Sequence, residues 1–139
     1  MKKLITVLVT ILFWSTAPVV AQDSEQDLTR MEHVMATHDE VMKEMPKLSK
    51  LINKLQTKAD TSTSKEKYQN AIVDLKNVNK SMMDWMAGFG NRFEADEMMN
   101  GKKLSVQKEK WLLEEEQKIT TLKDEIDLSI AKGQAVLEE

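Results

Sequence analysis

The chain has 139 residues and a formal net charge of −3, and it contains 4 Gly, 2 Pro and no Cys. This length supports one domain rather than two, and the scarcity of Gly and Pro excludes a turn-rich β-sandwich or barrel. The absence of Cys excludes disulfides, thiolate metal sites, a thiol nucleophile and a lipid-carrying cysteine.

The first 21 residues have the three parts of a secretory signal. Two lysines follow Met1, an apolar run extends from Leu4 to Trp14, and Val19-Val20-Ala21 forms a small-residue cleavage site. The apolar run is shorter than the roughly 20 residues that a bilayer span needs. We therefore expect cleavage after Ala21, a periplasmic or secreted protein, and no stable membrane span in the mature chain, residues 22–139.

The first predicted helix covers about residues 24–57, with Asp23 or Ser24 as its cap. Its apolar positions recur at alternating steps of three and four, as along the seam of a coiled coil. This stripe contains Leu28, Met31, Met35, His38, Met42, Met45, Leu48, Ile52 and Leu55. Pro46 interrupts the pattern. Because proline removes a backbone donor and crowds the preceding turn, we expect a kink near His38 to Met45 rather than an end.

The second predicted helix covers about residues 64–88. Thr63 and Glu66 have the spacing of a capping box at its start. The segment Gly88-Phe89-Gly90-Asn91 is expected to end it, because these residues tolerate a left-handed backbone. The apolar stripe contains Tyr68, Ala71, Leu75, Val78, Met82, Trp85 and Phe89.

The third predicted helix covers about residues 102–138, after an irregular stretch from Arg92 to Gly101. Its expected inner face contains Leu104, Trp111, Ile119, Leu122, Ile126, Ser129, Gly133 and Val136. Short turns between long helices favour antiparallel neighbours. The predicted fold is therefore all-α: a single elongated up-down-up three-helix bundle with coiled-coil-like packing.

Methionine is frequent, at 10 residues, and it gathers around one histidine. If the first hairpin turns near residue 60, His38 faces Met82 and Met35 faces Trp85. A second turn near residue 95 brings Leu104, Gln107 and Trp111 to the same level. Thioether and imidazole groups select soft ions such as Cu(I). The predicted metal ligands are Met35, His38, Met42, Met82 and Met86, with Trp85 as a cation–π lid.

Simple packing is the competing interpretation of the same residues, because Met at helical spacing fills irregular cores well. Haem ligation by a Met and His pair is disfavoured, since three helices leave little room. No catalytic motif is present: the Glu-x-x-His pattern of di-iron bundles, a Gly-rich phosphate loop and a nucleophile elbow are all absent from the sequence. We therefore expect no enzymatic activity and no certain cofactor, with Cu(I) or Ag(I) as the candidate ion.

Three sequence words resemble a known family: His38-Asp39-Glu40-Val41-Met42, Met82-Met83-Asp84-Trp85-Met86, and Ser129-Ile130-x-x-Gly133. The resemblance is to small exported helical proteins of Gram-negative bacteria labelled "viral A-type inclusion protein". It covers most of the mature chain and implies an exported, coiled-coil-like helical protein, but no assigned activity. Family members often carry a lipoprotein cysteine and an earlier proline, whereas this chain has no Cys and has its proline at Pro46.

The functional expectation is a non-enzymatic exported helical bundle that acts by binding or scaffolding in the cell envelope. Its partner would be an unknown envelope protein or a second copy of the chain. A holdase chaperone and a periplasmic Cu(I) or Ag(I) binder are the alternatives. Nucleic acid is not an expected partner, because the mature chain is acidic and has no contiguous basic block.

Overall fold

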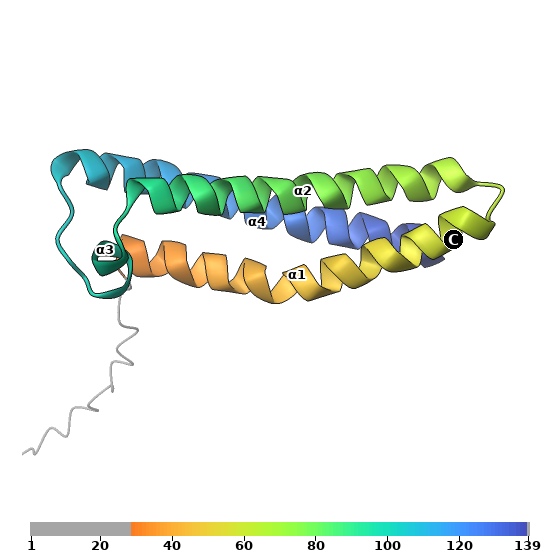
Figure 1. The fold of residues 1–139 in the computed structure, drawn as a ribbon, viewed down its shortest axis with the longest axis horizontal. Coiled ribbons are helices and arrows are strands. Elements are labelled where there is room, and N and C mark those ends of the chain that lie inside the picture. The colour runs from red at the N-terminus through yellow and green to blue at the C-terminus, as the bar shows by residue number, and fades with distance from the viewer. Residues whose placement is uncertain (1–28, 139) are drawn as a thin grey trace, which may run out of the picture.

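The computed structural model describes residues 29–138, and all regular elements within them are helices. Three long helices, α1 (Arg30–Thr61), α2 (Lys65–Arg92) and α4 (Val106–Glu138), each pack against the other two. A short helix, α3 (Ala95–Met99), follows α2 and precedes α4 in the sequence, and it contacts α1. Figure 1 shows an elongated rod in which α2 runs opposite to α1 and α4. The all-α prediction is confirmed, but there are four helices in this part of the chain rather than three.

No helix in residues 29–138 is long and apolar enough to span a bilayer. The expected signal segment, residues 1–21, lies outside the described residues, as do the expected caps Asp23 and Ser24.

Helix α1 begins with a capping box at Thr29. The Thr29 hydroxyl accepts a hydrogen bond from the backbone N–H of Glu32, and the Glu32 carboxylate accepts one from the Thr29 N–H at 2.7 Å. The side-chain and backbone bonds to Thr29 hold the pKa of Glu32 below its usual value. Pro46 lies inside α1, which continues to Thr61. Figure 1 shows α1 bending near its middle, as expected where a proline interrupts the hydrogen bonds of a helix.

Helix α2 differs from its prediction at both ends. Its N-cap is Ser64, which makes no side-chain capping bond, so the expected capping box is not formed. At the other end the helix continues past Gly88 to Arg92 and closes with a 3.1 Å bond from the Phe93 N–H to the Phe89 carbonyl. The prediction of an end at Gly88 was wrong because neither Gly88 nor Gly90 has a left-handed backbone.

The connection between α2 and α4 is built around a buried carboxylate. Glu97 of α3 accepts a 2.8 Å bond from the backbone N–H of Glu94 and a 2.6 Å bond from Lys108 Nζ. The first bond caps α3, and the second ties α3 to the first turns of α4. These two bonds, with the Glu94 bond the larger cause, hold the pKa of Glu97 below its usual value. The stretch expected to be irregular thus contains one short helix, α3, and α4 starts at Val106 rather than near residue 102.

Glu97→Gln should make the stability of the protein less dependent on acid pH. A carboxylate whose pKa is lowered on folding contributes stability above its unfolded pKa of 4.5, and that contribution is lost as the pH falls through the folded pKa. The loss of melting temperature between about pH 6 and pH 3 should be smaller for the variant than for the parent chain. Glu125→Gln, at an exposed position of α4, is the control and should keep the parental slope. Equal slopes for all three proteins would show that the Glu97 bonds do not contribute.

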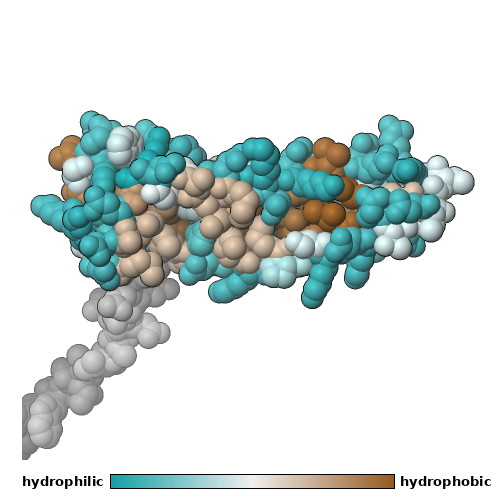
Figure 2. Space-filling model, in the orientation of Figure 1, coloured by the Kyte–Doolittle hydropathy of each residue, from teal (hydrophilic) through white to brown (hydrophobic). Residues whose placement is uncertain are grey.

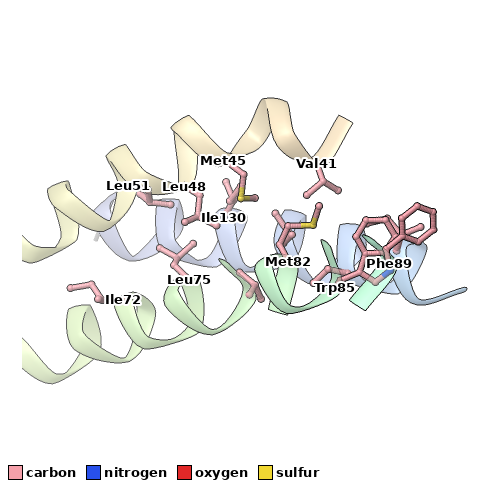
Figure 3. Close-up of a cluster of buried hydrophobic side chains, with 14 of the residues drawn as sticks. Val41, Met45, Leu48, Leu51, Ile72, Leu75, Met82, Trp85, Phe89 and Ile130 are labelled. Atoms are coloured by element: carbon pink, nitrogen blue, oxygen red, sulfur yellow. The ribbon is translucent and has the colours of Figure 1, made fainter. Parts of the chain in front are cut away.

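The predicted apolar stripe of α2 is confirmed. Its buried residues are Tyr68, Ala71, Ile72, Leu75, Val78, Met82, Trp85 and Phe89. Several of these side chains point into the space between α1, α2 and α4, where Leu75 lies near Leu48, Leu51 and Ile130 (Figure 3). The core is therefore continuous along the rod.

In the first half of α1, the buried residues lie one sequence position before the predicted ones. Its buried residues are Met31, Val34, Thr37, Val41, Met45, Leu48, Leu51, Leu55 and Ala59. Met35, His38 and Met42 are only half-buried. A helix that contacts two neighbours buries a wider face than a two-stranded coiled-coil seam, so residues on both sides of the predicted line enter the core. Leu28 lies outside the described residues.

Helix α4 supplies the third side of the core. Its buried residues are Leu112, Glu115, Ile119, Leu122, Ile126, Ile130 and Gly133. Of the predicted inner face, Leu104, Trp111, Ser129 and Val136 are half-buried. Gly133 allows close packing, because a Cβ there would stand 2.9 Å from Leu51 Cδ2 and 3.2 Å from Leu75 Cδ1.

Candidate functional site

The ring of His38 stacks on the indole of Trp85, and this contact shows which parts of α1 and α2 face each other. The ring centroids are 6.0 Å apart and the planes are inclined by 29°. His38 was expected to face Met82, and Trp85 to face Met35. The contact is displaced by about one helical turn, because the two helices are joined at residues 62–64, later than the expected turn near residue 60. The sequence therefore predicted correctly that His38 and Trp85 lie in the same region, but it predicted the wrong register between α1 and α2.

Met35 and Met42 lie on the same flank of α1 as His38. They are three residues before it and four after it, so all three side chains follow one line on the helix surface. Both methionines are half-buried and pack against the edge of the core. We call Met35, His38, Met42, Trp85 and Met86 the methionine seam.

His38 is held by its neighbour in the sequence. Its Nδ1 lies 3.0 Å from Asp39 Oδ1, and its side chain is 18% exposed. A carboxylate on Nδ1 leaves the other ring nitrogen, Nε2, for a further ligand, which is the arrangement of most metal-binding histidines. Asp39 was missed in the sequence analysis, although its position directly after His38 was the available signal.

The methionines of α2 are divided between the core and the surface. Met82 is fully buried and lies beside Val41 and Trp85 in the interior (Figure 3). Met83 is 44% exposed and Met86 is 37% exposed. Figure 2 shows a band of moderately apolar surface along the face between α1 and α2, from the α3 end to the middle of the rod. Of the predicted ligands, Met35, His38, Met42 and Met86 are thus accessible at least in part, whereas Met82 lies beneath them.

Trp85 begins a column of aromatic rings inside the α3 end of the bundle. Its ring is 4.9 Å from that of Phe89, which is 4.7 Å from that of Phe93. The indole Nε1–H is buried and has no hydrogen-bond partner among residues 29–138. The stack gives His38 a rigid support on one ring face.

The second hairpin does not bring Leu104, Gln107 and Trp111 to the level of His38. The Trp111 ring lies 5.4 Å from the Arg92 guanidinium, near the end of α2. The connection through α3 is longer than the expected turn near residue 95, so α4 enters the bundle later in the sequence. The ion pair of Glu40 with Lys123 indicates that later residues of α4 lie beside the His38 region.

Conventional hard-ligand sites are not present in the described part of the chain, where no group of three or more His, Cys, Asp or Glu residues could hold a metal ion. The second histidine, His33, pairs with Glu116 at 3.1 Å and is half exposed. Glu116 also pairs with Arg30 at 2.9 Å. His33 therefore belongs to a surface ion-pair network rather than to the methionine seam.

No protein-family model matches the chain, and neither a curated protein nor a solved structure is significantly similar to it. The resemblance to the exported helical family remains a prediction from the sequence words alone.

Proposed function

We propose that this chain is a non-enzymatic, exported binding protein and that its ligand is a soft monovalent ion, Cu(I) or Ag(I), held at the methionine seam. The observation that carries the proposal is the position of Met35, His38 and Met42. They lie at the edge of α1, half-buried, while other residues of the helix fill its central core stripe. Two thioethers and an imidazole therefore share one partly accessible flank, outside the stripe that the bundle buries most deeply.

The chemistry of the seam suits this class of ion. Thioether sulfur and imidazole nitrogen bind Cu(I) well and bind hard cations poorly. Asp39 orients the imidazole. Trp85 is 8% exposed and stacks on both His38 and Phe89, so it supports the imidazole rather than acting as the expected cation–π lid. In an exported protein, Met and His also remain available as ligands where cysteines would be oxidised to disulfides. Export itself is proposed from the signal-like residues 1–21.

Titration of the purified chain with Cu(I), under reducing conditions and against a competing chelator, tests the proposal. We expect one equivalent to be retained and the Trp85 fluorescence to change. His38→Gln and Met42→Leu should each weaken binding by more than about tenfold, which is the lower bound for losing even an outer-sphere partner of a metal ligand. Met99→Leu is the matched control, because Met99 is 73% exposed on α3, away from the seam.

Binding that is equal in Met42→Leu, Met99→Leu and the parent chain would contradict the proposal. The second candidate is then a protein partner or a scaffolding role on the same face. It is favoured by the exposure of Met83 and Met86, since flexible thioethers adapt to apolar partner surfaces.

A further inference from the structure

The second half of α1 carries a row of lysines on one face. Lys43, Lys47, Lys50, Lys54 and Lys58 follow at steps of four, three, four and four, and all five are exposed. Steps of three and four keep side chains on one side of a helix. The row extends over about 22 Å at 1.5 Å per residue. Because other residues separate the lysines in the sequence, the row forms no contiguous basic block and becomes visible only on the folded helix.

The charge of this lysine face is largely unneutralised. From Met45 to Ala59 the sequence contains no Asp or Glu. In the described part of the chain, Lys47 pairs with Glu44 at 3.2 Å, and the other four lysines of the row have no carboxylate partner. Lysines at the α3 end, by contrast, are neutralised: Lys108 pairs with Glu97, and Lys118 with Glu115. Positive charge is therefore concentrated on one face of an otherwise acidic molecule.

A groove of about 510 Å³ runs beside this face, between α1 and the end of α4. Lysines form its α1 rim, while Pro46, Leu51 and Leu137 supply apolar lining. Glu138 is the single carboxylate among its described lining residues. The lysine ammonium groups of such a surface can bind the anionic groups of a ligand, and the apolar lining can contact the carbon atoms of the same ligand.

We propose that the lysine face of α1 docks the protein on an anionic lipid headgroup surface. A row of like charges along one helix meets an extended array of phosphates better than it meets a small anion, which could contact only one or two lysines. Basic faces on amphipathic helices bind such surfaces through their summed charge. The occupant is thus a phospholipid surface, bound peripherally, and this site lies on a different flank of α1 from the methionine seam.

Nucleic acid is the less suitable polyanion for this face. Single strands of nucleic acid are held largely by stacking of bases on aromatic side chains, and none of the described residues that line the groove is aromatic. The net charge of −3 opposes general attraction to any polyanion, so the protein must present this one face to bind. A flat, laterally extended lipid surface permits that orientation.

Co-sedimentation of the mature chain, residues 22–139, with vesicles tests the proposal. Vesicles of phosphatidylcholine containing about one third phosphatidylglycerol should bind the protein at low salt, whereas pure phosphatidylcholine vesicles should not. Binding should fall as salt is raised. The variant Lys50→Gln/Lys54→Gln/Lys58→Gln should reduce the partition coefficient by more than about tenfold. The matched control, Lys76→Gln/Lys110→Gln/Lys132→Gln, removes the same charge from exposed positions elsewhere and should bind as the parent does.

Three results would overturn the proposal: equal loss of binding in the two triple variants, equal binding to neutral vesicles, or displacement by millimolar inorganic phosphate, which would identify a small-anion site instead. A fourth result, binding of DNA more tightly than of vesicles with the same loss in the first triple variant, would also overturn the proposal, because it would assign the face to nucleic acid. Circular dichroism of both variants verifies that each remains folded.

Discussion

Leu75→Ala should lower the free energy of unfolding by about 2–5 kcal/mol, which is the range for truncating a fully buried leucine. Leu75 has no solvent exposure and lies between all three long helices, so its removal leaves a cavity that no single helix can close (Figure 3). For a domain of this size the melting temperature should fall by roughly 10–20 °C. Val73→Ala, two residues away and 53% exposed, is the control and should change the free energy of unfolding by less than about 0.5 kcal/mol. Equal effects of the two substitutions would contradict this core.

Gly133→Ala provides a second measurement on the same cavity. In the parent chain the new methyl group would gain about 1 kcal/mol of helix propensity but would press on Leu51 and Leu75 at 2.9 and 3.2 Å. When Leu75 is already alanine, one of these contacts is gone and the methyl group fills part of the space. Gly133→Ala should therefore stabilise the Leu75→Ala background more than it stabilises the parent, as measured in a double-mutant cycle. An additive result would show that α2 and α4 do not meet at this point.

The sequence predicted the buried face of α2 better than that of α1, because the apolar pattern of α1 allows two alternative buried faces. In α2 the apolar positions form one line, and the structure buries that line. In the first half of α1 two lines compete: Met35, His38 and Met42 on one, and Val34, Thr37 and Val41 on the other. The second line is the more buried, although it contains a polar residue. Thr37 can be buried because its hydroxyl donates to the His33 carbonyl at 2.9 Å, a local bond that spacing alone does not reveal.

The candidate site was predicted only in part for the same reason. Spacing along one helix correctly placed Met35, His38 and Met42 on one flank. Which residues of α2 they face depends on where the chain turns between the helices. The turn was predicted a few residues too early, so the prediction placed Met82 opposite His38, whereas Trp85 lies there. Met82 is buried while Met83 and Met86 are exposed, because only Met82 lies on the side of α2 that faces α1 and α4. That orientation can be known only from the packed bundle.

The charged residues show a comparable limit. The segment Glu114-Glu115-Glu116 has the sequence of an ordinary solvated helix face, yet Glu115 is 3% exposed. It lies at the three-four spacing of the buried residues Leu112 and Ile119, and this was the available signal. A carboxylate is tolerated there only because cations from two helices reach it.

Arg92→Met should destabilise the protein by about 3 kcal/mol, the low end of the range for breaking a buried ion pair. Arg92 Nη1 donates to the carboxylates of Glu115 and Glu114, each at 2.9 Å. Without it the buried carboxylate of Glu115 keeps one cationic partner among residues 29–138, Lys118, whose Nζ lies 2.8 Å away. Methionine preserves the aliphatic packing near Trp111, so the measured loss reports mainly the missing charge. Chemical denaturation followed by far-UV circular dichroism gives the free energies of unfolding.

Glu115→Leu in the Arg92→Met background should then restore most of the lost stability, because it removes the buried carboxylate that no longer has its main partner. Lys118→Met is the matched control: its side chain is 53% exposed, and its loss should cost less than about 1 kcal/mol. If Arg92→Met lowers the free energy of unfolding no more than Lys118→Met does, or if Glu115→Leu lowers it further, the Arg92–Glu115 ion pair does not stabilise the packing of α2 against α4. If the rescue is found, the arginine is retained to neutralise Glu115. The bundle could then replace both residues by apolar ones without losing its packing at the α3 end.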